Sequence, residues 1–549
     1  MLKRKIKIAV IMTVEDPELS CLVKSIDSVL QQTYSQWQLC LVSNGTKRKK
    51  TISYLKSLND KRVFVKFLKK RVMTSVALNT ALGLTKASYV ALIDNSDFLA
   101  THALEKVALA VNKTDPDLIY SDEDSVDLNG NFINPHYKSD YSPDTILSHN
   151  YIGHLLVLRM GILNFVGKFD KSFKAAYGYD FLLRSLENVH KIYHIPEILY
   201  HCKLHPFTER GISLTSSLLL KEERRALNDA CRRQGVLAAV LPGIHLGTYR
   251  VKRKIEGRPL VTVIIPFRDK PDFLKRCLDS ILEQTSYDHF NILCMDNDSR
   301  EASTARLMKE YALKYKQVTC YKHAGPFNFS RINNCAVRLT KAEHVILLNN
   351  DMEIITPGWI EALLEHSQRP EVGAVGAKLY YPGGNVQHAG VVIGIKEAAG
   401  HAHKNLGRHH SGYFYRSQII QNVSSVTAAC LMVKRRLYMK LGGLNEVNLP
   451  IAFNDTDFCL RLAERGYLNI FTPYCELYHY EAATRGRILS LEMYEQVMKD
   501  IAYFRKRHRT ILKRGDPYYN PNFPLHTECF GLLTGTTRLV QPVGSNISF

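Results

Sequence analysis

Long apolar runs are the first thing that these 549 residues lack. No stretch approaches the ~18–20 apolar residues that a membrane-spanning helix needs. The apolar run near the start is interrupted by Lys7 and leads into Glu15 and Asp16 without a small-residue cleavage site. That pattern favours a first strand over a signal peptide. We therefore expect no membrane-spanning helix.

Paired cysteines are also lacking. The 12 cysteines are scattered, none forms a C-x-x-C pair, and several lie inside apolar runs. This usage argues against a disulfide framework and against a zinc site of closely spaced cysteines. It is typical of reduced, buried thiols and predicts a cytoplasmic protein.

Acidic residues are in deficit. There are 73 Lys and Arg against 52 Asp and Glu, a formal net charge of +21. Such a surplus indicates an anionic partner, which could be a nucleic acid, an anionic membrane face or a phosphorylated substrate. Because no aromatic and basic residues interleave and no recognition motif is present, we expect no nucleic-acid partner.

Apolar runs alternate with amphipathic stretches along the first part of the chain. Expected strands are 6–12, 38–42, 63–67 and 89–93, and expected helices are 18–32, 47–58 and 75–84. Strands that alternate with helices over short loops predict an α/β fold with a parallel, doubly wound sheet.

The same order returns in the second half. Expected strands are 260–265, 290–295, 318–322 and 345–348, with helices at 271–284, 303–314 and 332–339. Residues 27–33 match residues 279–285, and the offset grows slowly along the chain, which indicates two copies of one domain. The domains expected are 1–216, a helical and basic linker 217–258 with the boundary near 245–258, 259–490, and a C-terminal basic helix and tail 491–549.

Polar residues follow the strand at 345–348 abruptly. Central strands of open α/β sheets deliver ligands at their carboxyl ends. Asp351 is an oxygen ligand of the kind that Mg²⁺ or Mn²⁺ accepts, and Asn349 could face the same side. An ordinary Asn-Asn-Asp turn is the alternative.

Ordered motifs across residues 259–485 resemble the family-two glycosyltransferases of the GT-A fold, and more narrowly the tandem-domain enzymes that build O-antigen, rhamnan-type or galactofuran-type polysaccharides. The motifs are Val263–Pro266, Met295–Ser299, Leu348–Asp351 in place of the family's DxD, Gln387–Gly390, Val426–Cys430, Phe453–Arg461 and Glu476–Glu481. The first half matches through Tyr120–Asp124, Asn150–His154 and Ile198–His201. The resemblance implies two tandem GT-A domains.

The resemblance implies a seat for a nucleoside-diphosphate sugar. Asp296 at a strand end could accept the imide N–H of a pyrimidine base, or it could be a turn residue. Pro266 is expected to shape the loop under the base. The remaining expected contacts are Asn297, Asn334, Asn349 and Asn350, although an ordinary helix start would also explain the asparagines near 334.

The resemblance also implies a metal, Mg²⁺ or Mn²⁺, that stabilises the leaving diphosphate. Asp351 would be its main ligand and His479 the second. Asn349 stands where the family usually has Asp, and a neutral amide is a weaker ligand. A satisfied core histidine is the alternative for His479.

Asp455 is the expected general base for the acceptor hydroxyl. One base opposite the leaving group implies inversion at the anomeric carbon. Asn454 occupies a position where many relatives have Glu or Asp. Asp457 and Arg461 lie four residues apart, so we expect a structural ion pair on a helix.

The first copy departs at these positions. Ser96 is expected opposite Asp351, and Gly178 opposite Asp455, while Asp94 and Asp97 remain. These losses predict a domain that kept its fold and lost catalysis.

The expected function is therefore an inverting, metal-dependent glycosyltransferase that extends a glycan, which the resemblance implies is lipid-linked. The alternatives are a bifunctional transferase and a non-catalytic glycan-binding scaffold. The basic stretch 499–514 could lie on an anionic inner membrane face or pack on the catalytic domain. We expect a cytoplasmic location, with peripheral attachment to the inner face of the membrane as the finer alternative.

Overall fold

The structure is a computed structural model that describes residues 4–204, 217–481, 490–528 and 530–531. The chain forms two compact units. Of the described residues, 4–141, 149–204 and 217–251 form the first unit, and 142–148, 252–481, 490–528 and 530–531 form the second. Residues 532–549 of the expected tail lie outside the described residues.

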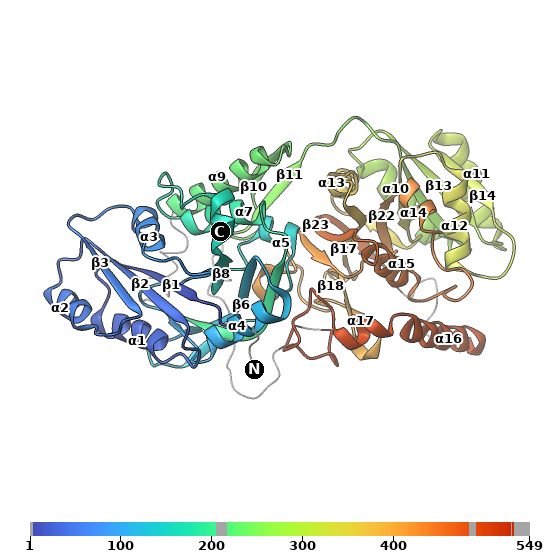
Figure 1. The fold of residues 1–549 in the computed structure, drawn as a ribbon. Coiled ribbons are helices and arrows are strands. Elements are labelled where there is room, and N and C mark those ends of the chain that lie inside the picture. The colour runs from blue at the N-terminus through green and yellow to red at the C-terminus, as the bar shows by residue number, and fades with distance from the viewer. Residues whose placement is uncertain (1–3, 205–216, 482–489, 529, 532–549) are drawn as a thin grey trace. The chain divides into compact units, whose positions relative to one another are not determined.

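The first unit is built on a nine-stranded sheet of order β3-β2-β1-β4-β8-β6-β9-β5, with β7 paired to β6 (Figure 1). Its strands are β1 Ile8–Val14, β2 Trp37–Asn44, β3 Val63–Leu68, β4 Tyr89–Leu92, β5 Phe98–Leu99, β6 Leu118–Val126, β7 Phe132–His136, β8 Leu156–Arg159 and β9 Ile192–Lys203, and the separate pair is β10 Ala238–Pro242 and β11 Tyr249–Arg253. Its helices are α1 Leu19–Leu30, α2 Lys49–Ser57, α3 Thr74–Leu82, α4 Ala103–Thr114, α6 Leu163–Val166, α7 Tyr177–Leu186 and α9 Ser217–Arg233.

The second unit is built on a ten-stranded sheet of order β14-β13-β12-β15-β22-β17-β23-β16, with β18 paired to β17 and β21 to β23. Its strands are β12 Val261–Phe267, β13 Phe290–Asp296, β14 Val318–Lys322, β15 His344–Leu348, β16 Met352–Ile354, β17 Val372–Tyr380, β18 Val386–His388, β21 Gln421–Val423, β22 Cys430–Lys434 and β23 Leu468–His479, and the separate pair is β19 Val391–Ile393 and β20 Ala399–His401. Its helices are α5 Pro143–Ser148, α10 Pro271–Gln284, α11 Ala302–Lys314, α12 Phe329–Leu339, α13 Trp359–Ser367, α14 Arg435–Lys440, α15 Asn454–Ala463, α16 Leu491–Arg507 and α17 Arg509–Arg514.

The two sheets repeat one topology. Strands β12 to β15 pair as β1 to β4 do, in parallel, and each sheet then continues through an antiparallel neighbour, β8 or β22. Successive side chains of a strand point to opposite faces, and along β12 Val263 and Ile265 enter one buried cluster while Ile264 enters the other. Burial on both faces explains the continuous apolar runs in the sequence. The expected fold, two tandem GT-A domains with mainly parallel sheets, is confirmed.

The region expected to be a linker packs on the first unit. Helix α9 is anchored by Glu222, whose carboxylate accepts hydrogen bonds from the backbone N–H groups of Lys174, Ala175 and Ala176 at the start of α7. A carboxylate at a helix start satisfies orphan donors and favours the helix dipole. Residues 217–251 therefore belong to the first domain, and amphipathic pattern alone did not reveal this docking.

Helix α5 belongs to the second unit although it lies among first-copy residues in sequence. Its Asp144 is buried and accepts a hydrogen bond from Arg369 Nη1 at 2.5 Å, with Arg253 Nη2 at 3.6 Å. The Asn422 amide donates to the same carboxylate at 3.0 Å. These two guanidinium groups outweigh burial and lower the pKa of Asp144.

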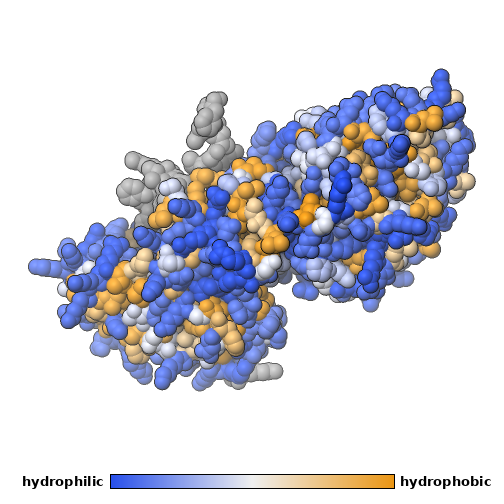
Figure 2. All heavy atoms as spheres, turned by 90° about the horizontal axis from the view of Figure 1, so that it is seen from above, coloured by the Kyte–Doolittle hydropathy of each residue, from blue (hydrophilic) through white to orange (hydrophobic). Residues whose placement is uncertain are grey.

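Helix α16 is docked on the second unit. Phe504 is fully buried, and Asp500 accepts from the backbone N–H groups of Ile451 and Ala452. Among the described residues, no helix is long and apolar enough to cross a bilayer. On the face of the molecule that Figure 2 shows, hydrophobic residues are scattered among hydrophilic ones.

Candidate active site

Polar residues gather where the central strands of the second sheet end. Asp351 lies in the short turn between β15 and β16, and Met352, the first residue of β16, pairs with His479 at the end of β23. The backbone of Asp351 also accepts from Tyr480 N–H at 2.9 Å. The sheet thus brings together two residues that are far apart in sequence and were both expected to bind metal.

The buried carboxylate of Asp351 lies 3.3 Å from Nε2 of His479. On the other side of the ring, Nδ1 lies 2.6 Å from Oε1 of Gln387. The Gln387 amide nitrogen donates to Glu481 at 3.0 Å, so its oxygen must accept, and Nδ1 of His479 must carry a proton. In the neutral ring, Nε2 therefore keeps its lone pair, and the Asn349 amide lies 3.3 Å from it.

This arrangement fits a divalent cation. The buried carboxylate of Asp351 and the Nε2 lone pair of His479 face each other, and Gln387 fixes the ring as outer-shell partners of metal-ligating histidines do. Oxygen and imidazole donors of this kind are suitable for Mn²⁺ or Mg²⁺. The amide oxygen of Asn349 is a third potential donor, because a rotated amide would present it to the same point.

Asp455 lies in the first turn of α15. Its Oδ2 accepts from Ala428 N–H at 2.9 Å, and its Oδ1 accepts from Thr456 N–H at 2.7 Å. These two backbone donors hold the carboxylate in one orientation. The side chain is only partly buried, so a substrate hydroxyl could approach it.

The ion pair expected on α15 is present. Arg461 Nε donates to Asp457 Oδ2 at 2.8 Å, and His508 Nε2 lies 2.9 Å from Oδ1 of the same carboxylate. Burial raises the pKa of Asp457, but His508 and Arg461 outweigh it and the net pKa is lowered. Asn454 is buried, and its amide donates to Leu449 O at 3.4 Å. These residues hold the helix in place.

The residues expected to bind the nucleotide differ in exposure and in their hydrogen bonds. Asp296 ends β13, is partly exposed, and accepts from Ser299 N–H at 2.9 Å in a turn. Pro266 is buried in β12 opposite Met295. Asn297 is buried and donates to the carbonyls of His323 and Gly325 at 3.2 and 3.0 Å. Asp296 is therefore accessible to solvent at the end of β13. Asn297 connects its own loop to the loop after β14 through its two hydrogen bonds.

The other asparagines differ in their surroundings. Asn334 donates to Leu444 O and Glu446 and accepts from Tyr438 Oη and Leu444 N, so its amide is fully used. This geometry favours a structural role for Asn334, and we leave it out of the proposed site. Asn350 is buried beside Asp351, and its Nδ2 finds no acceptor in the part of the chain that the structure describes.

Three residues near the site received no individual role from the sequence. Gln387 orients His479, as described above. His388 is buried and accepts from Gly390 N–H through Nε2 at 3.3 Å, so its Nδ1 carries the proton and donates to Nδ1 of His401 at 2.8 Å. The Gln387–Gly390 motif was the sequence signal, and only the fold shows which atoms its side chains contact.

The first copy requires one correction. Phe98 pairs with His201 as Met352 pairs with His479, so Asp97, and not Ser96, stands opposite Asp351. One extra residue in the first copy's turn explains the error in the sequence offset. Asp97 is buried and accepts from Tyr200 Oη and Lys203 N–H, and burial raises its pKa.

The first-copy counterpart of the base is Gly178. Asp180 and Arg184 form an ion pair at 2.7 Å on α7, as Asp457 and Arg461 do on α15. Counting back two residues from each aspartate places Gly178 opposite Asp455. The first copy thus lacks a carboxylate at the position of the expected base.

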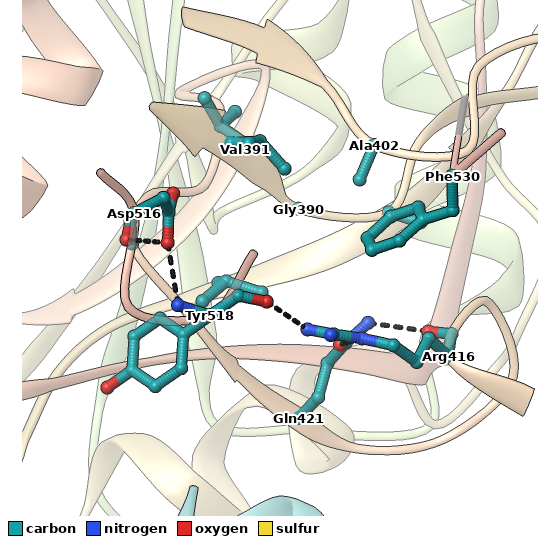
Figure 3. Close-up of a pocket in the computed structure, with 12 residues that line it drawn as sticks. Gly390, Val391, Ala402, Arg416, Gln421, Asp516, Tyr518 and Phe530 are labelled. Carbon is teal, nitrogen blue, oxygen red and sulfur yellow. Dashed lines mark hydrogen bonds between the residues drawn. The ribbon is translucent and has the colours of Figure 1, made fainter. Parts of the chain in front are cut away.

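A small pocket in the second unit is lined by Gly390, Ala402 and Arg416, among other residues (Figure 3). Arg416 crosses it, donating to Gln421 Oε1 at 3.0 Å and to Tyr518 O at 2.8 Å, while Asp516 accepts from Tyr518 N–H. Its volume of about 10 Å³ holds about one water molecule. It is too small for a sugar nucleotide and is not the donor site.

The chain belongs to glycosyl transferase family 2. The profile of that family matches residues 9–170 and 262–442, which is one match in each unit. The resemblance noted in the motifs is thereby confirmed.

Two relatives align over nearly the whole chain. An uncharacterized protein of Sinorhizobium fredii is 38% identical over 96% of this chain and 58% of its own length. The O-antigen biosynthesis protein RfbC of Myxococcus xanthus is 34% identical over 96% of this chain and 41% of its own length. The chain therefore spans about half the length of these relatives.

Solved structures of glycosyltransferases are similar to parts of the chain. S. aureus TarS in complex with UDP-GlcNAc has a TM-score of 0.35 at 16% identity, covering 41% of this chain and 66% of that one. GalNAc-T7 with UDP, GalNAc and Mn²⁺ has a TM-score of 0.38 at 11% identity, covering 46% and 50%.

Proposed function

We propose that the chain is an inverting glycosyltransferase that moves a sugar from a nucleoside-diphosphate sugar to a growing cell-surface glycan, with its active site in the second unit. Family membership supports the reaction class, and similarity to an O-antigen biosynthesis protein supports the type of product. One observation carries the proposal: the ring of His479, oriented by Gln387, directs its lone pair to the buried carboxylate of Asp351.

Asp351 and His479 would hold Mg²⁺ or Mn²⁺, which when bound supplies positive charge to the departing diphosphate. Asp296 and Pro266 would hold the base of the nucleotide, and Asn297, Asn349 and Asn350 would line the path from base to sugar. These residues lie at carboxyl ends of neighbouring strands, where open α/β sheets bind nucleotides.

Asp455 would remove the proton of the attacking acceptor hydroxyl at one of its carboxylate oxygens. Both oxygens accept from backbone N–H groups, which orient the carboxylate. Attack from the face opposite the leaving diphosphate inverts the anomeric carbon. Asn454, Asp457 and Arg461 keep α15 in position and take no part in proton transfer.

In this proposal the first unit performs no transfer. Its Asp97 is engaged by Tyr200 and by a backbone N–H group, and Gly178 replaces the base. The acceptor would be lipid-linked, and the enzyme would work in the cytoplasm, peripherally on an anionic membrane face. The net charge of +21 supports that last point.

The test is to incubate the purified chain with a panel of sugar nucleotides and Mg²⁺ or Mn²⁺ and to measure nucleoside diphosphate release with and without a glycan acceptor. We expect release with one donor, loss of release in excess chelator, and loss in Asp351→Ala. Full activity in chelator would overturn the metal assignment. Binding of glycan without release from any donor would favour the scaffold alternative, and release that survives Asp351→Ala but not Asp97→Ala would favour an active first unit.

A further inference from the structure

A cluster of one thiol, one imidazole and one carboxylate lies in the first unit. Cys202 Sγ is 3.5 Å from Nδ1 of His154, and the same Nδ1 is 3.2 Å from Oε2 of Glu123. Candidate ligand atoms of all three residues lie within 4.8 Å of one another. The residues come from β6, β9 and the loop before β8, so no sequence spacing could have revealed the cluster.

These distances are those of ligands around one zinc ion. Zinc bonds of about 2.3 Å to sulfur and about 2.0–2.2 Å to nitrogen and oxygen place tetrahedral ligands about 3.6 Å apart for sulfur and nitrogen and about 3.4 Å for nitrogen and oxygen. The observed 3.5 and 3.2 Å are close to both values. A thiolate with an imidazole also suits zinc, whereas Mg²⁺ and Ca²⁺ select oxygen donors.

Surrounding groups hold Glu123 in place. The backbone N–H of His154 donates to Oε2 at 2.8 Å, Lys138 Nζ lies 3.2 Å from the same oxygen, and Nδ1 of His136 lies 3.5 Å from Oε1. These contacts fix the orientation of the Glu123 carboxylate, as a metal ligand requires.

The backbone makes room for the carboxylate. Gly153 has a φ of +50°, and a Cβ at this position would lie 2.8 Å from Oε1 of Glu123. Only glycine fits that close approach without displacing the side chain. The His154 side chain is 48% exposed, so the cluster reaches solvent and leaves a fourth ligand position for water.

The cluster has no counterpart in the second copy. Strand pairing shows that Tyr380 of the second copy occupies the position of Glu123. His201 and His479 occupy matching positions, so Tyr480, the next residue, takes the place of Cys202. Arg159 of the first copy corresponds to Lys434 of the second, because each pairs with the first residue of the matching parallel strand. Counting back five residues from each shows that Ala429 occupies the position of His154. The cluster is thus not a remnant of the donor-metal site at Asp351.

We propose that Glu123, His154 and Cys202 form a second metal site that binds zinc, or cobalt in its place, in the first unit. On binding, the Cys202 thiol releases its proton to solvent and its sulfur bonds to the metal. Nδ1 of His154, which lies beside the Glu123 carboxylate, likewise releases to solvent the proton it holds and bonds through its lone pair, so that the neutral ring keeps one proton, on Nε2. The site is independent of the proposed transfer reaction.

The experiment uses the full chain after removal of metal with a chelator and dialysis. Titration with Co²⁺ should produce a thiolate-to-cobalt charge-transfer band that saturates at about one ion per chain, and Zn²⁺ should bleach it. Cys202→Ser should abolish the band. Glu123→Gln, which keeps the shape of the side chain, should retain the band but raise the apparent dissociation constant at least about 10-fold.

Cys320→Ser is the matched control, because Cys320 is a free and partly exposed cysteine of the second unit. It should leave the band unchanged, as should Asp351→Ala, and Cys202→Ser should leave nucleoside diphosphate release with Mn²⁺ unchanged. Thermal melting checks that each variant is folded. Absence of the band in the parent chain, or a band that survives Cys202→Ser, overturns the proposal.

Discussion

In the proposed mechanism the carboxylate of Asp455 accepts a proton, and its first-copy counterpart, Gly178, has no side chain that could do so. Asp455→Asn keeps the shape of the side chain and removes the proton acceptor. Because general-base assistance contributes about 10²–10⁴-fold, turnover at saturating donor should fall by that factor while donor binding changes little. The measurement is transfer rate and donor affinity for each variant. Asp94→Asn, an exposed strand-end aspartate of the first copy, is the control and should transfer at the parent rate. Loss of transfer in Asp94→Asn alone would place the active site in the first unit.

Gln387 provides a second test at the scale of single residues. Gln387→Ala removes the acceptor that fixes the ring of His479 and leaves the Asp351 carboxylate in place. Outer-shell partners of this kind contribute about 10–100-fold to metal affinity, so the Mn²⁺ concentration for half-maximal activity should rise by that factor. Turnover at saturating Mn²⁺ should recover. Gln418→Ala, which removes a buried amide that donates to Arg408 O, is the control, and an equal shift in both variants would contradict the assignment.

The strand-end residues show what the sequence could and could not predict. Asp351 and His479 were expected from motifs, and their role at a metal stays a prediction. The Asp457–Arg461 pair was expected from helical spacing and is present, because local pattern determines which side chains share a helix face. The match of Asp97 to Asp351 was missed, because one inserted residue in a turn shifts an offset that only strand pairing can correct. The zinc cluster was also missed, because its members are separated by 31 and 48 residues.

At the scale of elements, α15 and the segment after α16 meet through one buried carboxylate. Asp457 is paired with Arg461 and His508, and its pKa is lowered in the folded chain. A lowered folded pKa means that the stabilisation is complete above the unfolded value of about 3.9 and is lost as pH falls through the folded value. Asp457→Asn should therefore melt well below the parent at pH 7, and the gap should narrow as the pH falls below about 4.

The measurement is thermal melting between neutral and acid pH. Asp288→Asn is the control, because Asp288 also pairs with an arginine, Arg258, but its side chain is 74% exposed. Solvent screens that pair, so its melting temperature should stay near that of the parent at every pH. A gap between Asp457→Asn and the parent that stays constant down to strong acid would contradict the pairing.

The elements themselves followed closely from the sequence. Residues 271–284 form α10 and residues 318–322 form β14, with the expected bounds. Pro271 in the first turn marks the start of α10, and the short apolar run sets the length of β14, so both signals are local. The packing of α9 and α16 was not determined in the same way. Each was amphipathic, but buried carboxylates, Glu222 and Asp500, fix their partners through backbone N–H groups that no pattern identifies.

At the scale of the whole molecule, the second unit includes a helix that is encoded before residue 252. Asp144 of α5 is 1% exposed and faces Arg369 and Arg253. Asp144→Ala leaves the guanidinium groups of Arg369 and Arg253, whose side chains are only 13% and 10% exposed, without this carboxylate, which should destabilise the unit by about 3–5 kcal/mol. The measurement is denaturant unfolding. Asp115→Ala also removes a carboxylate that pairs with two arginines, but Asp115 is 46% exposed, so it should change stability by less than about 1 kcal/mol.

A truncated chain that starts at residue 252 tests the contribution of α5 to the stability of the second unit without a substitution. It lacks α5, so it should unfold at lower denaturant than the second unit does within the full chain. Equal midpoints would show that α5 contributes nothing to the unit. The sequence did not predict this packing of α5, because the residues that contact Asp144 are Arg253, Arg369 and Asn422, each more than 100 residues away along the chain.

The charge and the surface of α16 together predict binding to anionic membranes. Leu491, Tyr494 and Met498 are exposed and lie on one helix face, whereas Phe504 of the same helix is buried. Basic residues of the last turn, among them Arg505 and Lys506, accompany them. An apolar stripe with basic residues is the pattern of a helix that lies in a membrane interface.

The chain should therefore sediment with anionic vesicles at low salt and be released as salt rises, because the Debye length shortens from ~30 Å at 0.01 M to ~8 Å at 0.15 M. Leu491→Ser combined with Met498→Ser should weaken binding at both salt concentrations, since apolar burial is not screened. Leu313→Ser is the control, because Leu313 is 79% exposed on α11 without such a stripe. Equal binding to neutral and anionic vesicles would remove the electrostatic contribution, and equal binding of the double variant and the parent would remove α16 from the contact.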